Sequence, residues 1–306
     1  MTEQNDPSAE RTRGAILVTA SAVAFGLAGG MTKLIHADVM TITSWRGLFG
    51  GLIITAYVLW RRSNNGGSLR LGWRGWLLAA VGAAASIAFI SAFKYGFVAN
   101  AAIIYATVPF VAAVMAWLML RERFRLQTML AATVSLIGVS IMVAAGIAGG
   151  SPFGDALALV MTCLAALYMV LIRMFRETPV VWAGAVSAFM LFVLGWFVTD
   201  PLAVTSRDMI LLVAFGTSFA FAVVLWTEGA RLIPATEAGL LGSAEVPAAI
   251  LFAWLLLGEL PPATSLIGGA IVLAAVLTHA GLDWRRARRG KSRRDRIAAE
   301  PLHPAE

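Results

Sequence analysis

The sequence has a single cysteine and little charge, and these two shortages already exclude several classes of protein. Of its 306 residues, 13% are Asp, Glu, Lys or Arg. Cys163 stands alone, so we expect neither a disulfide within one chain nor a cysteine-built metal site. His36, His279 and His303 form no ligand motif, and the sequence has no Gly-rich phosphate loop and no Asp-rich cluster. We therefore expect no metal, no cofactor and no ATP-driven step, and nothing in the sequence indicates an enzyme.

The shortage of charge is concentrated in long uninterrupted runs. A membrane-spanning helix needs about 20 mostly apolar residues, and a run of roughly 18 or more without charge is a candidate. Hydrophobic residues make up 59% of the chain and the mean hydropathy is +0.80, which is too apolar for a soluble protein of this length. The runs are also too long and too uniform for barrel strands. Six of them carry no Asp, Glu, Lys or Arg at all: 75–93, 95–120, 126–154, 178–199, 209–227 and 260–282.

We expect an all-α integral membrane protein with ten transmembrane helices. The connecting segments are short, and none of them can hold a soluble domain. The first apolar run passes straight through the small residues 20–22, so we do not expect a cleaved signal peptide. Segment 1–13 and the basic tail 282–306 are expected to be disordered and cytoplasmic. The expected spans are 14–35, 39–60, 73–93, 98–120, 126–147, 154–174, 180–199, 208–230, 235–257 and 263–281.

The distribution of basic residues predicts the orientation. Lys and Arg near span ends collect on the cytoplasmic side. Of the 24 basic residues, Lys33, Lys94 and Arg207 fall on one side of the expected topology, Arg46 lies within the second span, and all others fall on the opposite side with both termini. Both termini are therefore predicted to be cytoplasmic. The basic tail is better explained by topology and by contact with anionic lipid than by nucleic-acid binding, so membrane lipids are expected partners and nucleic acid is not.

The chain repeats itself. Residues 92–122 (AFKYGFVANAAIIYATVPFVAAVMAWLMLRE) match residues 229–259 (GARLIPATEAGLLGSAEVPAAILFAWLLLGE), and 14–33 match 154–173. Each half therefore has five spans, and an odd number means that the second half enters the membrane from the opposite side, as in many secondary transporters. The repeats are predicted at 14–147 and 154–281. In the longer match Lys94 pairs with Arg231, Pro109 with Pro247 after a one-residue slip, Trp117 with Trp254, and Glu122 with Glu259.

These two matching segments and the five-plus-five plan resemble the drug/metabolite transporter superfamily, and within it the EamA-type exporters. The overall look is closest to bacterial amino-acid exporters of the YddG type. One departure is Arg121, which stands where the second copy has Gly258 before the glutamate. The resemblance implies an inner-membrane carrier, monomeric or homodimeric, with a central cavity between its inverted halves. It implies that spans 1, 3, 4, 6, 8 and 9 line this cavity, and that spans 5 and 10 pack outside it or support dimer contacts.

Pro109 and Pro247 lie in the middle of equivalent spans. A proline at such a position frees one backbone carbonyl and kinks the helix. The bend can act as a hinge or expose a carbonyl beside the substrate cavity, or it can be a static feature of packing. Because the two positions match between the repeats, we favour the hinge or cavity role.

Two spans contain an ionisable residue well inside, Arg46 and Glu245. A charge at the bilayer centre costs on the order of 3 kcal/mol, so each side chain is expected to face protein or water. Glu245 is close to mid-depth, and it either binds a substrate amine, carries a proton or belongs to a structural ion pair. For Arg46, which lies nearer the outer surface, we favour a structural role. Lys94 and Glu228 are nearer to helix ends and are expected to reach the interface.

Five aromatic residues lie deep in spans that the resemblance assigns to the cavity. Together they would form an apolar pocket with cation–π character, although plain helix packing is the alternative for each of them. These candidates are Phe25, Phe89, Tyr105, Tyr168 and Trp226.

The function that the sequence favours is export of small amphipathic metabolites, amino acids in particular, by alternating access. Aromatic or other apolar amino acids suit the aromatic candidates. The substrate would bind near the bilayer midplane between the inverted halves. One rival is a membrane-embedded enzyme that modifies lipid or prenyl groups, which needs a polar catalytic cluster that the sequence does not show. A second rival is a passive channel, which needs a continuous polar pore, whereas the polar residues here are scattered.

Overall fold

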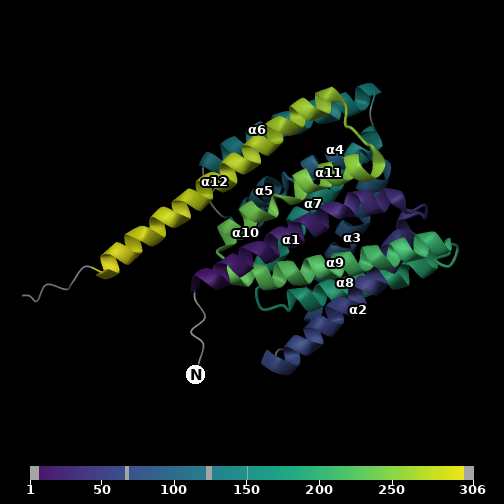
Figure 1. The fold of residues 1–306 in the computed structure, drawn as a ribbon, viewed down its shortest axis with the longest axis horizontal. Coiled ribbons are helices and arrows are strands. Elements are labelled where there is room, and N and C mark those ends of the chain that lie inside the picture. The colour runs from purple at the N-terminus through teal and green to yellow at the C-terminus, as the bar shows by residue number, and fades with distance from the viewer. Residues whose placement is uncertain (1–6, 66–68, 122–125, 150, 300–306) are drawn as a thin grey trace, which may run out of the picture.

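The computed structural model describes residues 7–65, 69–121, 126–149 and 151–299, and every regular element in these ranges is an α-helix (Figure 1). Ten spans are long and apolar enough to cross a membrane. The prediction of an all-α membrane protein with ten spans is confirmed. Glu122, which the repeat pairs with Glu259, lies outside the described residues.

Eight spans are single helices, and the first and last of them are longer than the sequence predicted. Where the sequence analysis expected disorder, the structure has helix at residues 7–13, which belong to the first helix, and in the tail as far as Ala299, which continues the last one. Proline suits the first position of a helix, as at Pro7, and the tail is rich in Arg and Ala, which favour helix. The single helices are α1 (Pro7–Leu34), α2 (Val39–Asn65), α3 (Gly72–Tyr95), α6 (Leu126–Gly149), α7 (Pro152–Met174), α8 (Val180–Val198), α9 (Ser206–Leu232) and α12 (Ala263–Ala299).

The fourth and ninth spans are each broken into two helices. Span 4 consists of α4 (Val98–Tyr105) and α5 (Val108–Leu120), and span 9 consists of α10 (Ala235–Gly242) and α11 (Glu245–Leu257). In both spans the second helix is the longer one. Helix α5 begins at Val108, directly before Pro109, and α11 begins at Glu245, shortly before Pro247. The matched prolines therefore mark matched breaks, one in each repeat.

The two halves are interleaved, because the helices of one pack against those of the other. Helix α1 packs along α9, and its counterpart α7 packs along α3. Helix α1 also contacts both parts of span 9, as α7 contacts both parts of span 4. Two equivalent pairs, α2 with α8 and α6 with α12, pack on each other directly. This exchange of partners is what an inverted repeat with an approximate two-fold axis requires.

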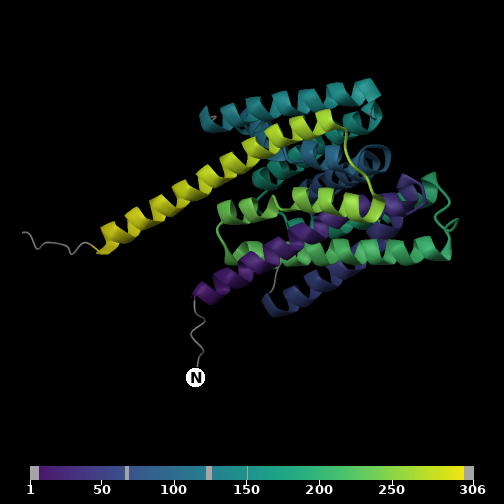
Figure 2. The same ribbon diagram turned by 45° about the horizontal axis from the view of Figure 1, so that its top comes forward.

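The bundle has two ends that differ in content. The start of α1 and the end of α12 lie at the same end in both views, which we call the terminal end (Figures 1 and 2). The opposite end, where α1 finishes at Leu34 and α4 begins at Val98, is called the distal end. An even number of spans places both termini on one side, whichever side of the membrane that is.

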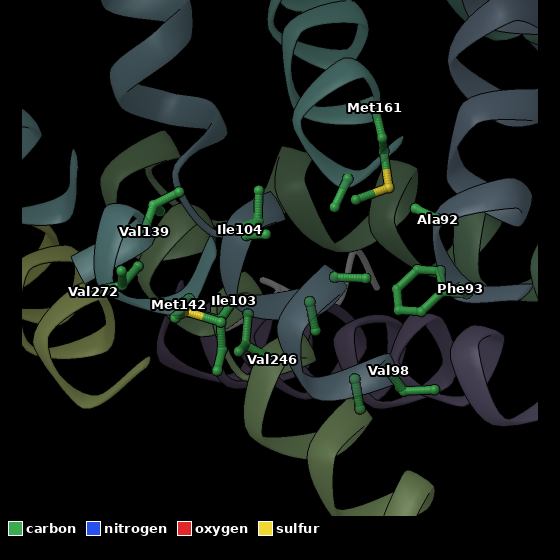
Figure 3. Close-up of a cluster of buried hydrophobic side chains, with 14 of the residues drawn as sticks. Ala92, Phe93, Val98, Ile103, Ile104, Val139, Met142, Met161, Val246 and Val272 are labelled. Atoms are coloured by element: carbon green, nitrogen blue, oxygen red, sulfur yellow. The ribbon is translucent and has the colours of Figure 1, made fainter. Parts of the chain in front are cut away.

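The largest buried apolar cluster surrounds α4 (Figure 3). Ile103 and Ile104 of α4 are 2% and 0% exposed, and the cluster around them includes side chains from six other helices. The first half of span 4 is therefore held by both repeats at once. The labelled neighbours are Ala92 and Phe93 of α3, Val139 and Met142 of α6, Met161 of α7, Val246 of α11 and Val272 of α12.

Glycines allow the paired helices to approach closely. A Cβ atom added to Gly47 of α2 would lie 2.4 Å from the carbonyl oxygen of Ala188 on α8. Between α6 and α12, a Cβ at Gly138 would lie 2.7 Å from the carbonyl oxygen of Gly268. In a membrane, close packing of this kind replaces much of the hydrophobic driving force. Both direct contacts between equivalent helices thus depend on the absence of a side chain.

We predict that Gly47→Ala destabilises the protein, because its methyl group meets a backbone oxygen that cannot rotate away. The expected loss is about 1–3 kcal/mol, as for other overpacked sites. Thermal unfolding in detergent measures it. Gly184→Ala on α8 is the matched control, because a Cβ there meets nothing within 4 Å. Equal melting temperatures for the two variants would show that the α2–α8 contact tolerates a methyl group.

Candidate substrate site between the two halves

Arg46 of α2 is buried among aromatic rings and has no acidic partner among the described residues. Its guanidinium carbon lies 4.4 Å from the ring centre of Phe219 and 5.4 Å from that of Phe215, both on α9. It donates a hydrogen bond to Ser86 Oγ of α3. The side chain is 6% exposed. The rings and the hydroxyl stabilise the cation but leave its charge uncompensated.

Glu245 is the first residue of α11 and lies at the break of span 9. Its side chain is half-buried, and its carboxylate makes no hydrogen bond or ion pair with any residue in the described ranges. It lies close enough to Tyr105 of α4 to act on that phenol electrostatically. The structural ion pair considered for Glu245 is therefore absent from this conformation, within the described part of the chain.

The predicted aromatic residues fall along one path through the bundle. Phe25 of α1 packs edge-on against Phe219, with ring centres 6.2 Å apart. The Phe219 ring also makes the cation–π contact with Arg46 described above. Phe89 follows Ser86 by one turn on α3 and packs edge-on against Tyr105, with centres 6.0 Å apart. Because the charge of Glu245 acts on Tyr105, the path from Phe25 past Arg46 leads toward Glu245.

The two remaining aromatic candidates lie beside this path. A Cβ atom added to Gly82, one turn before Ser86 on α3, would lie 3.3 Å from the Tyr168 ring of α7. Trp226 of α9 touches Gly242, where a Cβ would lie 2.8 Å from the indole ring. Gly242 ends α10 immediately before the break that carries Glu245. The structure thus places all five aromatic candidates along or beside one path with the buried Arg46 and the half-buried Glu245, while their role in binding stays a prediction.

Backbone hydrogen bonds show how the broken spans are accommodated. At the break of span 9, the Val246 N–H donates to the Ser243 carbonyl at 3.3 Å. Pro247 has no N–H to donate to the Ser243 carbonyl, four residues earlier, but Val246 donates to that carbonyl instead. The expectation of a freed carbonyl is therefore wrong at this break. At the break of span 4, the Thr107 N–H donates to Ile104 O at 3.1 Å. At each break the chain therefore passes through one hydrogen bond between residues three apart, with its backbone still in the right-handed helical region, and the α-helix then resumes.

Lys94 and Glu228 lie away from this region, at opposite ends. Lys94 Nζ donates to the carbonyl of Ile35 at 2.5 Å, which ties α3 to the turn after α1 at the distal end. Glu228 lies at the terminal end, where Arg61 Nη1 and Arg231 Nη1 are 3.1 and 3.5 Å from its Oε1. Tyr57 also donates a hydrogen bond to Glu228.

The distal end is tied together across the repeats. Lys33 at the end of α1 forms an ion pair with Glu259, which follows α11. The other oxygen of Glu259 accepts the Val98 N–H at the start of α4, where a helix terminus favours negative charge. Helix α4 also packs against α11 here. One carboxylate therefore joins three helices at this end.

The terminal end is less closed. The described parts of α5 and α10 do not pack against each other as α4 and α11 do. A pocket of about 750 Å³ follows one face of α1 from Arg11 to Val23. Glu237 of α10 lines its rim and pairs with Arg11, with Nη2 and Oε2 2.7 Å apart. The distal end is thus closed by helix packing and an ion pair, whereas the terminal end has a surface pocket beside α1, which none of the candidate substrate residues lines.

Sequence reasoning missed several residues of this arrangement. Ser86 and Phe219, which hold Arg46, carry no sequence signal that sets them apart from packing residues. Lys33 and Glu259 did carry one, because each closes a repeated segment, yet their pairing depends on how the halves interleave.

Comparison with known proteins agrees with this architecture. The sequence model of the EamA-like transporter family matches twice, at residues 12–144 and 152–279. The crystal structure of another protein aligns over 91% of this chain and 98% of its own length, at 20% sequence identity. The TM-score of 0.60 shows a shared fold. No curated protein matches the sequence significantly. Since the two matches cover most of the sequence, the chain belongs to the EamA-like transporter family.

Proposed function

We propose that this protein is a secondary transporter that exports small metabolites, with amino acids as the substrate class, across the bacterial inner membrane by alternating access. The family supports small-molecule transport rather than enzymatic chemistry. The excess of basic residues at the terminal end supports cytoplasmic termini. In this orientation the distal end faces outward, and the pocket beside α1 faces the cytoplasm.

The observation that carries the substrate class is the pair of opposite, unpartnered charges in one aromatic region. Arg46 and Glu245 each lack an ion pair within the described residues, although a charge inside the membrane costs on the order of 3 kcal/mol. A zwitterion supplies what both lack, since its carboxylate suits the guanidinium and its ammonium suits the carboxylate. The aromatic rings between the two charges favour an apolar side chain.

The unequal ends of the bundle support a carrier rather than a channel. A channel needs a polar passage open at both ends, whereas the distal end is closed by α4 packed on α11 and by the Lys33–Glu259 pair. The matched breaks in spans 4 and 9 place a bendable segment in each half. In an inverted repeat, exchanging the conformations of the two halves would close the terminal end and open the distal one.

The first test is counterflow in proteoliposomes. Vesicles loaded with an unlabelled amino acid are expected to accumulate the labelled one transiently, because a carrier exchanges substrate across the membrane. A panel of aromatic, aliphatic and charged amino acids identifies the preferred side chain. A channel or an enzyme gives no counterflow, so its absence across the panel overturns the proposal.

We predict that Glu245→Gln weakens exchange without loosening the fold. Losing a charged hydrogen bond to a substrate amine costs about 1.5–3 kcal/mol, or roughly ten- to a hundredfold in affinity. The melting temperature is expected to hold, since no partner is stranded in the described structure. Glu177→Gln, an exposed carboxylate between α7 and α8, is the control. Wild-type exchange in Glu245→Gln would remove this residue from the substrate site.

We also predict that Lys33→Met opens the distal end more often. A partly buried ion pair is worth about 1 kcal/mol, which corresponds to roughly a fivefold change in population. A cysteine at Ala101, buried at 1% in α4, reports opening through its labelling rate in a Cys163→Ala background. Arg207→Met, which removes an exposed charge at the same end, should leave that rate unchanged. Identical rates in both variants would show that the Lys33–Glu259 pair does not hold this end shut.

A further inference from the structure

Asp155 and Asn100 form a buried polar pair between the two halves. Asp155 lies in the first turn of α7, and Asn100 lies near the start of α4. The Asn100 Nδ2 atom donates to Asp155 Oδ1 at 3.2 Å. Both side chains are 1% exposed. The substrate region described above does not include either residue.

The backbone around the pair excludes water. A Cβ atom added to Gly154 would lie 2.2 Å from the Cα of Gly96, so α7 touches the turn between α3 and α4 with no side chain between them. Ser151, which caps α7, also donates from its hydroxyl to the carbonyl of Tyr95. The acid and the amide are therefore fixed against each other in a dry contact.

Each member of the pair retains one oxygen without a hydrogen bond. These atoms are Asp155 Oδ2 and Asn100 Oδ1, and both are buried. Two acceptors without a donor are unfavourable in a buried site, and an ionised carboxylate without a cation is more so. One proton on Asp155 Oδ2 removes all three costs, because it neutralises the acid and can be donated to Asn100 Oδ1. Together with the bond from Asn100 Nδ2 to Asp155 Oδ1, this proton would make a two-bond pair in which each side chain donates once and accepts once.

No neighbouring charge replaces this proton. Helix α7 packs against α3, α4, α5 and α6. The described parts of α5 and α6 carry no ionisable residue, and the only one on α4 is Tyr105 at its far end. On α3, Arg74 lies at the opposite end, Lys94 binds Ile35 O, and the Tyr95 ring packs on Phe153. Glu259, bound to the Val98 N–H nearby, is itself an anion paired with Lys33.

A metal cation fits the pair less well than a proton does. Hard cations bind six or so oxygens, whereas this contact offers two free ones. The start of α7 presents N–H groups, which disfavour a cation and offset only part of the cost of an ionised Asp155. In the described residues, no group of three or more acidic, histidine or cysteine side chains gathers to hold a metal.

We propose that Asp155 and Asn100 form a proton-binding site that fastens α7 to α4 while the distal end is closed. Proton release leaves a carboxylate that must reach water, which requires the two helices to separate. This inference rests on the proposed alternating access. In that cycle the site takes up a proton when the distal end closes and gives it to water when that end opens. In the repeat, the alignment that pairs Lys94 with Arg231 also pairs Asn100 with Glu237. Glu237 of α10 forms an ion pair with Arg11 of α1, so the contact between α1 and α10 at the terminal end is ionic.

The test compares Asp155→Asn with a swapped pair. Asp155→Asn keeps both hydrogen bonds as an amide–amide pair but cannot lose a proton. The double variant Asn100→Asp with Asp155→Asn restores an acid–amide pair with the roles exchanged. In the wild type, the folded site holds a proton that the unfolded chain releases, so the melting temperature should fall as the pH rises from mildly acid to mildly alkaline. This extra slope should vanish in Asp155→Asn and return in the swapped variant.

Infrared spectra at neutral pH give a second readout that needs no transport. The wild type and the swapped variant should show the carbonyl band of a buried protonated carboxylic acid, and Asp155→Asn should lack it. Equal pH slopes in the wild type and Asp155→Asn, or no such band, overturn the proposal. Stabilisation of the wild type but not of Asp155→Asn by sodium at constant ionic strength also overturns it, in favour of a metal cation. Because no substrate is used, these outcomes are independent of whether amino acids are exported.

Discussion

A charge or a backbone polar group inside the hydrocarbon layer has no water to bind, so it must find a partner within the protein. The bundle meets this demand in different ways. Aromatic rings and a serine hydroxyl surround Arg46, while Lys33 and a helix terminus satisfy Glu259. The broken spans close their own backbone with tight turns. Glu245 is left without any such partner in the described structure, which is why we propose it as the residue that binds a substrate amine.

The fold was predictable because the membrane imposes a simple length and composition rule on every span. Uncharged runs identified the ten spans, and the repeat with an odd number of spans identified the inversion. The prolines predicted where spans 4 and 9 break, but not how many residues each break involves. The turn also includes side-chain bonds such as that from Ser243 Oγ to the Leu240 carbonyl at 2.6 Å. At the start of α1 and the end of α12, polar composition led to an expectation of disorder, whereas the structure has helix there, and Arg and Ala continue a helix readily.

The candidate site was predictable only in part. Arg46 and Glu245 are conspicuous in sequence because a charge in an apolar run is costly, and the five aromatic residues followed from the spans expected to line a cavity. Their partners Phe219 and Ser86 come from different helices, and helix faces are chosen by packing that no single segment encodes. Asp155 and Asn100 were missed for the same reason, since each lies near the start of a helix, where a polar residue looks ordinary.

The glycine contacts of α2 with α8 and of α6 with α12 have a mechanical consequence. In each pair, equivalent helices of the two repeats meet, so both contacts lie on the approximate two-fold axis. A movement that exchanges the shapes of the two halves displaces atoms least along that axis and most at the helices farthest from it. Under the alternating access proposed above, the two glycine seams would act as a pivot. The opening movement would then fall mainly on the crossed pairs around them, α1 with α9 and α3 with α7.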